Sequence, residues 1–357
     1  MVSTIMGEPI NRLSLYFTTP KSVELREEKI PALKPGQVLI RSLFSAISPG
    51  TELLVYRHQI ATEQPLDANI QSLPGNFQYP LKYGYSVVGK VVSSGRGFDS
   101  AWTGKTVFIF HPHESFFPAG LDELIEIPEG ITPLDAVFLP NMETAVNFVM
   151  DGHPILGEKV VVLGQGIVGL LTASILAQFP LKNLVTLDLF PLRRRVSLRS
   201  GAQISLDPNS KESLMQIKTL LRDEYSAGAD LVYEISGNAE ALNNAIELTG
   251  FDGRIIVGSW YGSKPVNLKL GESFHRSRIK LISSQVSTIN PGFLGRWNKS
   301  RRFQTAWQMI GQIRPSQFIS RQLPLTQASE AYRILDENPG EVIQIVFTYP
   351  DSEEDHV

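Results

Sequence analysis

The feature that most constrains this chain is a buried strand that leads directly into a glycine-rich turn and then into an uncharged helix. Residues 160–162 are three valines in a row, a composition that favours a strand. The turn that follows has the G-x-G-x-x-G spacing, and residues 160–181 contain no charged side chain. A strand before this spacing and a helix after it form the context in which it binds a dinucleotide. The predicted contacts are Gly164, Gly166, Ile167, Val168 and Gly169.

Each glycine of this turn has a physical reason in a dinucleotide site. Gly164 permits the sharp turn, Gly166 lets backbone N–H groups approach a diphosphate, and Gly169 lets the helix lie close to the sheet. The positive N-terminal end of the helix then faces the phosphates. A second predicted strand ends in Asp188, 19 residues after Gly169, where a carboxylate accepts hydrogen bonds from the adenosine ribose. The alternative is a parallel-sheet turn that binds no ligand.

The charges after Asp188 bear on which dinucleotide binds. A carboxylate at this position suits a ribose 2′-hydroxyl and repels a 2′-phosphate, so we expect NAD. Arg193, Arg194 and Arg195 follow five residues later, and they favour the alternative, NADP, if they reach that phosphate. Arg193 is therefore included among the candidate cofactor contacts.

The uncharged stretch at 160–181 also has about the length of a membrane span. Three glycines, Gln165, Gln178 and Pro180 interrupt it, which fits a strand, turn and buried helix better than one lipid-facing helix. The first eleven residues have no basic segment followed by an apolar core, so no secretory signal is predicted. We expect a cytoplasmic protein with no membrane partner.

The absence of cysteine excludes several kinds of chemistry. With no cysteine in 357 residues, disulfides, iron–sulfur clusters, thiolate zinc sites and cysteine nucleophiles are ruled out. The formal charge of −3 also argues against nucleic acid as a partner.

The pattern of elements predicts an α/β protein with a β-rich domain and a doubly wound parallel sheet. Residues 1–150 alternate between short strands and Pro-Gly turns and form a predicted β-rich domain. Residues 151–289 alternate between strands and helices, as in a Rossmann dinucleotide-binding domain. Residues 290–357 are predicted to return to the first domain. The six strands expected in the central domain are 159–163, 184–187, 203–206, 231–235, 254–257 and 280–284.

Four segments carry a resemblance to a known family. They are ISPGTE at 47–52, GYSVVGKV at 84–91, META at 142–145 and the closing segment 323–332. With the dinucleotide motif between them, the chain resembles the medium-chain dehydrogenase/reductase superfamily, the alcohol dehydrogenase-like enzymes, over nearly its whole length. The Ser-Pro-Gly-Thr-Glu and Gly-Tyr-Ser elements are similar to a branch that includes bacteriochlorophyllide dehydrogenases. The resemblance implies that residues 1–150 form a GroES-like catalytic domain. It also implies a nicotinamide cofactor, a small-molecule substrate and a homodimer or homotetramer.

The chain departs from the family where zinc-dependent members bind their catalytic metal. By position, Pro49 stands where they have cysteine, Tyr85 where they have histidine and Ser86 where they have glutamate. Proline and tyrosine do not rebuild a tetrahedral zinc site, so we expect a zinc-free enzyme. Thr51 matches the family's proton-relaying hydroxyl, and Tyr85 is a candidate hydrogen-bond donor to a substrate oxygen, its alternative role being simple packing.

One pair of histidines invites a metal interpretation. His111 and His113 are separated by Pro112, and Glu114 follows, so two imidazoles and a carboxylate lie close in sequence. The proline interrupts a strand, and no distant third ligand is evident, which argues against a metal site. A place in the substrate cleft is the other interpretation.

The predicted function is a zinc-independent, NAD(P)-dependent oxidoreductase that transfers a hydride between nicotinamide and an alcohol or carbonyl. Two alternatives stay open, an NADPH-dependent enone or quinone reductase and a non-catalytic dinucleotide-binding sensor. Residues 273–329 contain no acidic side chain but several basic ones, among them Arg296, Arg301 and Arg302. This excess suggests an anionic substrate held by arginine. The alternatives are a solvated helix face, contact with the diphosphate of the cofactor, and a subunit interface.

Overall fold

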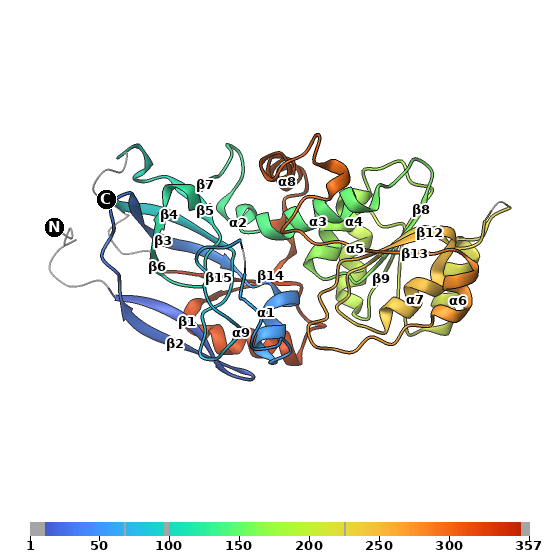
Figure 1. The fold of residues 1–357 in the computed structure, drawn as a ribbon, viewed down its shortest axis with the longest axis horizontal. Helices are drawn as coiled ribbons and strands as arrows, with labels where there is room; N and C mark the ends of the chain where they lie inside the picture. Colours follow the sequence, from blue (N-terminus) through green and yellow to red (C-terminus); the bar gives the residue numbers. More distant parts are fainter. Residues whose placement is uncertain (1–10, 68, 96–99, 225, 351–357) are drawn as a thin grey trace. The chain divides into compact units, whose positions relative to one another are not determined.

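The chain forms two compact units that are divided differently from the expected domains. The computed structural model describes residues 11–67, 69–95, 100–224 and 226–350 (Figure 1). The first unit comprises Met1–Pro140 and Ser316–Val357, and the second comprises Asn141–Pro315. Residues 141–150 and 290–315, which the sequence analysis placed with the β-rich part and with the return, thus belong to the dinucleotide-binding unit.

The second unit is a six-stranded parallel sheet covered by helices. Its spatial order is β10 (Ile204–Leu206), β9 (Asn183–Leu187), β8 (Lys159–Leu163), β11 (Ala229–Glu234), β12 (Thr249–Val257) and β13 (Lys280–Ser283). The connecting helices are α4 (Ile167–Leu176), α5 (Pro191–Arg199), α6 (Lys211–Leu220) and α7 (Ala241–Leu248). The strand order reverses direction between β8 and β11, and this switch point is where doubly wound sheets bind ligands.

Burial on both faces explains why the central strand is apolar throughout. Every residue of β8 is buried, as expected for a parallel strand with helices on either side. Val161 and Leu163 pack in one cluster with residues of α6 and α7, such as Ile217 and Leu242. Right-handed crossovers place α4 and α5 on the opposite face.

A buried arginine explains why α3 (Leu139–Gly152) and α8 (Lys299–Ile313) belong to the second unit. The guanidinium of Arg302, on α8, is completely buried and donates to Glu143 Oε1 at 2.8 and 3.1 Å. Glu143 lies on α3, and the same guanidinium donates to Asn147 Oδ1 at 2.6 Å. Losing either partner of a buried ion pair strongly destabilises the folded protein. The pair therefore holds α3 and α8 together in the unit that contains the parallel sheet.

The first unit is built on a largely antiparallel sheet, in which β14 and β15 pair in parallel. Its main path runs β14 (Ile319–Pro324), β15 (Gln344–Thr348), β3 (Gln37–Ala46), β4 (Val87–Ser94), β5 (Thr106–Ile109) and β7 (Ile125–Glu126), with β6 (Phe116–Gly120) also paired to β3. The hairpin of β1 (Asn11–Thr19) and β2 (Ser22–Lys29) forms a separate sheet. The helices are α1 (Pro49–Tyr56), α2 (Pro133–Ala136) and α9 (Ala328–Glu337). The C-terminal strand pairs with β3 through Val346 and Ala46, which joins the two ends of the chain in one unit.

A charged network attaches the β1–β2 hairpin to the rest of the first unit. Glu28 and Glu114 both accept hydrogen bonds from Arg12 and from the Lys82 ammonium. Burial raises the pKa of Glu28, but hydrogen bonds from Lys82, Tyr16 and Ser14 outweigh it and lower the pKa to about 2. The hairpin is therefore held by paired charges as well as by its apolar face.

The predicted α/β architecture with a β-rich unit and a parallel sheet is confirmed. All six strands expected in the second unit are present, and β8 has its expected bounds. Sequence analysis gave no bounds for β2 or β6 of the first unit; β2 is mostly charged and β6 contains Pro118, so neither has a clear apolar alternation. Within the described ranges, no helix combines the length and apolar character needed to cross a bilayer.

Candidate functional site

The glycine turn of the second unit has the backbone geometry that its spacing predicted. Gly164 follows β8 with a φ of +94°, and a Cβ there would lie 2.5 Å from Ser236 Cα. A Cβ on Gly169 would lie 2.0 Å from the carbonyl oxygen of Gly164. Both positions therefore exclude any side chain, the first by conformation and contact and the second by contact alone.

The middle glycine leaves open space at the start of α4. A Cβ added to Gly166 would meet only Arg193 Nη1, at 3.9 Å, among the described atoms. Gly166 is the N-cap of α4, whose first residues are Ile167 and Val168. The first N–H groups of a helix have no intrahelical partner, so this end offers donors and a positive dipole to an anion. The residues present fit the diphosphate of a dinucleotide.

Asp188 is buried directly after β9 and is bonded to the glycine turn. Its Oδ2 accepts from the backbone N–H of Gln165 at 2.7 Å, and its Oδ1 accepts from that of Phe190 at 2.8 Å. Each carboxylate oxygen has two lone pairs, so one acceptor site on each oxygen remains for ribose hydroxyls. This arrangement suits the predicted ribose contact.

The three arginines after Asp188 have different surroundings. Arg193 Nη1 lies 3.9 Å from Asp188 Oδ2, and its guanidinium packs over the Phe190 ring at 4.9 Å. Burial lowers the pKa of Arg193, and the Asp188 carboxylate opposes this shift. Arg194 turns away and donates to the carbonyls of Asp188 and Leu189, while Arg195 is exposed. Of the three, Arg193 is the one that lies beside the glycine turn.

The first unit brings Thr51 and Tyr85 together. Thr51 lies in the first turn of α1, and the Tyr85 hydroxyl donates to its Oγ1 at 3.3 Å. Ser48, which precedes α1, is buried, and its Oγ makes no hydrogen bond of good geometry within the described ranges. Burial raises the pKa of Tyr85, and the neighbouring Ser48 and Thr51 hydroxyls oppose that shift. The site thus contains three hydroxyls, of which sequence analysis missed Ser48.

A buried network of hydrogen bonds holds α1 in place. Glu52 Oε1 accepts from the backbone N–H of Ser48 at 2.7 Å, and Oε2 accepts from the Tyr332 hydroxyl. His113 Nε2 lies 3.1 Å from Glu52 Oε2, and its Nδ1 lies 2.7 Å from Ser45 Oγ. The helix that carries Thr51 is therefore positioned by segments far away in the sequence.

The two histidines of the HPHE segment do not share a site. The His113 ring is fully buried beside Glu52, whereas His111 stacks on Phe117 with ring centroids 3.6 Å apart. Burial lowers the pKa of His111 to about 4, although the Glu114 carboxylate opposes this shift. The described ranges contain no group of three His, Cys, Asp or Glu side chains arranged to hold a metal.

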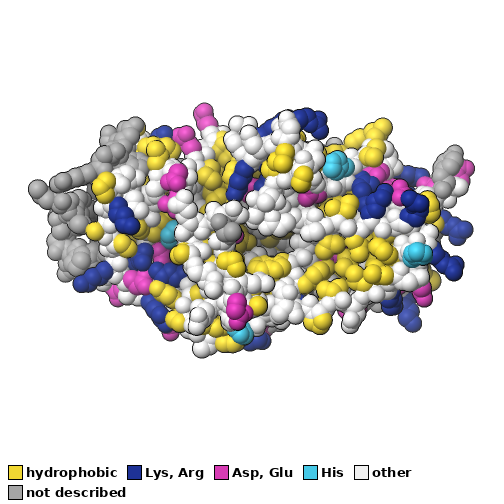
Figure 2. All heavy atoms as spheres, viewed as in Figure 1, with side chains coloured by type: hydrophobic (Ala, Val, Ile, Leu, Met, Phe, Trp, Pro, Cys, Tyr) yellow, Lys and Arg dark blue, Asp and Glu magenta, His cyan; other side chains and the backbone are white. Residues whose placement is uncertain are grey.

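One of the three arginines expected to hold an anionic substrate, Arg302, is committed to another partner. Arg302 is completely buried in its pairing with Glu143, so it is unavailable to a substrate. Arg301 donates to the carbonyl of Arg296 at 2.6 Å and packs over Trp297 at 4.2 Å. On the face shown in Figure 2, Lys and Arg side chains form separate groups with uncharged side chains between them.

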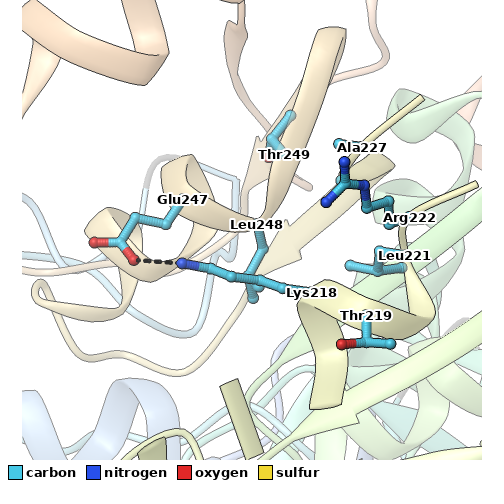
Figure 3. A pocket seen from close by; sticks show the side chains of 9 residues that line it. Lys218, Thr219, Leu221, Arg222, Ala227, Glu247, Leu248 and Thr249 are labelled. Carbon is cyan, nitrogen blue, oxygen red and sulfur yellow. Dashed lines mark ion pairs between the residues drawn. The ribbon is translucent and has the colours of Figure 1, made fainter. Parts of the chain in front are cut away.

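A surface groove lies at the opposite edge of the second unit from the glycine turn. It has a volume of about 590 Å³ and lies at the amino ends of β11 and β12, where Lys218 pairs with Glu247 at 3.6 Å (Figure 3). The glycine turn is at the carboxyl end of β8, which is the edge that binds ligands in such sheets. A dinucleotide on the glycine turn therefore does not use this groove.

Comparison with known proteins shows similarity along the whole chain. No protein-family model matches it. It is 26% identical over 355 residues to D-guloside 3-dehydrogenase of Escherichia coli K12, covering 94% of this chain and 99% of that protein. Among solved structures, 2R,3R-butanediol dehydrogenase from Bacillus subtilis matches with a TM-score of 0.76 at 16% identity, covering 95% of this chain and 100% of that one. A short chain alcohol dehydrogenase from Escherichia coli CFT073, complexed with NADH, matches with a TM-score of 0.74 at 18% identity, covering 95% and 99%.

The β-rich unit and the parallel-sheet unit with its glycine turn have the GroES-like and Rossmann fold of solved alcohol dehydrogenases. The resemblance seen in the sequence is confirmed. The chain is similar along its length to alcohol dehydrogenase-like proteins of the medium-chain dehydrogenase/reductase kind, and it is an NAD(P)-dependent, alcohol dehydrogenase-like oxidoreductase.

Proposed function

We propose that this enzyme is a zinc-independent, NAD-preferring dehydrogenase that interconverts a secondary alcohol and a ketone. The observation that carries the proposal is the hydroxyl pair of Tyr85 and Thr51, 3.3 Å apart. Tyr85 and Pro49 occupy the positions at which the family resemblance implies zinc ligands. This supports a role for the Tyr85 phenol, at one implied ligand position, in polarising the substrate oxygen in place of a metal.

The second unit supports the cofactor part of the proposal. Gly166 and the start of α4 suit a diphosphate, and Asp188 suits the two ribose hydroxyls. A bound nicotinamide cofactor supplies or accepts the hydride. The Asp188 carboxylate repels a 2′-phosphate, which favours NAD, although Arg193 beside the turn reduces that repulsion.

The first unit supplies hydrogen bonds and proton transfer. Because burial raises its pKa, the Tyr85 phenol stays protonated and can donate to a substrate oxygen. Its bond to Thr51 is long for an O–H···O contact, so it exchanges readily for a shorter bond to that oxygen. Thr51 then relays the proton to or from the substrate. Donors aimed at developing negative charge on the oxygen stabilise the transition state.

The substrate class we propose is a polyhydroxylated small molecule. D-guloside 3-dehydrogenase is named for an activity on a sugar derivative, and the butanediol dehydrogenase for one on a vicinal diol. An anionic group on the substrate would have to be held by residues other than Arg302, which is committed to Glu143.

The test combines a metal analysis with substitutions at the hydroxyl pair. We expect activity on sugar and polyol alcohols to survive exhaustive chelation, with far less than one zinc per chain by elemental analysis. Tyr85→Phe should lower kcat by about 10²-fold and leave the Kd of NADH unchanged, because the phenol acts on the substrate oxygen. Stoichiometric zinc that is lost together with activity would contradict the proposal.

Assays with a panel of alcohols, ketones and enones distinguish the two alternatives, an enone or quinone reductase and a non-catalytic sensor. Turnover of enones with NADPH, without turnover of secondary alcohols, would identify a reductase of the enone or quinone class. Tight cofactor binding without turnover of any alcohol, ketone or enone would identify a sensor.

A further inference from the structure

A buried carboxylate lies at the centre of the ligand-binding edge of the parallel sheet. Glu234 is the last residue of β11 and is completely buried. In the sheet register it lies between Leu163 of β8 and Val257 of β12. It therefore stands one residue away from the level of the glycine turn, on the strand beside it.

Hydrogen bonds satisfy this carboxylate on both oxygens. Glu234 Oε1 accepts from the backbone N–H of Ser236 at 2.9 Å and from its hydroxyl at 2.5 Å. Glu234 Oε2 accepts from the hydroxyl of Tyr261, in the segment after β12. Burying a carboxylate is costly unless such bonds are made. The arrangement thus joins the ends of β11 and β12 through side chains.

The bonds of Glu234 fix a turn at 236–238. Asn238 N–H donates to Ser236 Oγ at 3.1 Å, and Gly237 N–H donates to Ser259 Oγ at 2.8 Å. The Lys264 ammonium donates to the carbonyl of Gly237 at 3.2 Å. The turn is therefore held from the β12 side at three points, counting the pairing of Tyr261 with Glu234.

This turn packs directly on the glycine turn, backbone against backbone. The Ile235 N–H donates to the carbonyl of Leu163 at 3.0 Å. A Cβ on Gly164 would lie 2.5 Å from Ser236 Cα and 2.8 Å from the Ile235 carbonyl oxygen. No side chain separates the two turns, so their relative position depends on what holds the 236–238 turn in place.

The strand order indicates which half of a dinucleotide the turn affects. Asp188, the ribose candidate, follows β9 on one side of β8, whereas Glu234 ends β11 on the other side. A dinucleotide lies across the switch point, with its diphosphate at the glycine turn between the two sides. With the adenosine on the β9 side, the nicotinamide half lies on the β11 side.

We propose that Glu234 and Tyr261 are positioning residues for the nicotinamide half of the cofactor, acting through the 236–238 turn. This inference rests on the proposed dinucleotide function of the second unit. Neither residue is assigned a contact with the reacting atoms. Their role is to hold the 236–238 turn in the position in which the nicotinamide riboside packs against it.

The test compares two ligands on purified full-length protein by titration calorimetry. NADH has both halves of the cofactor, whereas ADP has only the adenosine and the diphosphate. Tyr261→Phe should raise the Kd of NADH about fivefold, the effect of one hydrogen bond, and leave that of ADP within about twofold. Ser236→Ala, which removes one hydroxyl bond to Glu234, is a second variant with the same expected pattern.

A matched control lies one residue before Glu234. The Tyr233 hydroxyl makes no hydrogen bond within the described ranges, so Tyr233→Phe removes a buried phenol oxygen without breaking such a network. It should leave both Kd values unchanged. Unchanged NADH binding in Tyr261→Phe and Ser236→Ala would overturn the inference, and so would equal weakening of NADH and ADP. A wild-type protein that binds neither ligand would instead overturn the proposed dinucleotide function.

Discussion

The two units hold their candidate functional groups by different kinds of contact. In the second unit, Asp188 is bonded to backbone N–H groups, and Gly164 and Gly169 are defined by backbone contacts. In the first unit, the helix that carries Thr51 is held by the side chains of Glu52, His113 and Tyr332. We infer that the first kind of site is sensitive to added volume, and the second to the loss of single polar atoms.

The largest effect is expected where a side chain is added to the glycine turn. Gly169→Ala places a Cβ 2.0 Å from the Gly164 carbonyl oxygen, so α4 must move away from the turn. NADH binding, measured by fluorescence titration, should weaken at least about 100-fold, because several backbone donors lose their alignment at once. Gly295→Ala is the matched control, since a Cβ there meets no described atom within 4 Å. Wild-type affinity for NADH in Gly169→Ala would contradict the inference that the site of the second unit is sensitive to added volume.

The next effect tests the hydroxyl site of the first unit. Thr51→Val keeps the shape of the side chain but removes the oxygen that bonds Tyr85. We expect kcat to fall about 10²-fold, with the Kd of NADH unchanged, because proton relay is lost and cofactor binding is not. Thr62→Val, whose hydroxyl donates to Glu63, is the control and should retain activity. An equal loss of cofactor affinity would contradict the assignment of proton relay to the first unit and cofactor binding to the second.

A smaller effect is expected on cofactor choice. Asp188→Ser removes the charge that repels a 2′-phosphate, so the ratio of the NADPH Kd to the NADH Kd should fall about tenfold. Arg193→Gln should change this ratio in the opposite direction, because its guanidinium lies 3.9 Å from the same carboxylate. A wild-type protein that prefers NADPH would contradict the role of Asp188 and favour that of Arg193.

The smallest effect concerns the pH dependence of stability in the first unit. Burial lowers the pKa of His111 from 6.5 to about 4, so the unfolded chain binds the proton more readily than the folded one. The contribution of the neutral His111 ring to folding stability is fully present above pH 6.5 and is lost as the pH falls towards 4. His111→Phe keeps the stacking on Phe117 and should reduce the fall in Tm between pH 7.5 and 5 by about 2 °C.

The control for this measurement is His58→Asn, at an exposed histidine whose positive φ of 55° asparagine also tolerates. Its stability should follow the wild-type pH profile in calorimetric scans. A His111→Phe protein with the same pH profile as the wild type would show that His111 contributes no such dependence.

Much of the second unit was predictable because its signals are local. A strand of valines, a glycine spacing and a carboxylate 19 residues later all lie within 30 residues. Glu234 and Tyr261 were not found, because their bond joins segments 27 residues apart and neither belongs to a recognised motif. A buried position at the end of a predicted strand, occupied by Glu234, was the one signal in the sequence that pointed to this carboxylate.

Local signals in the sequence were enough to predict the glycine turn, the order of strands and helices in the second unit and the absence of any thiolate site. Which charged side chains are available to a ligand depends on the tertiary packing. It placed Arg302 in a buried pair with Glu143, 159 residues away, and separated His111 from His113. The reason is physical: backbone conformation depends on neighbouring residues, whereas the burial and partners of a charged side chain depend on which distant segments pack around it.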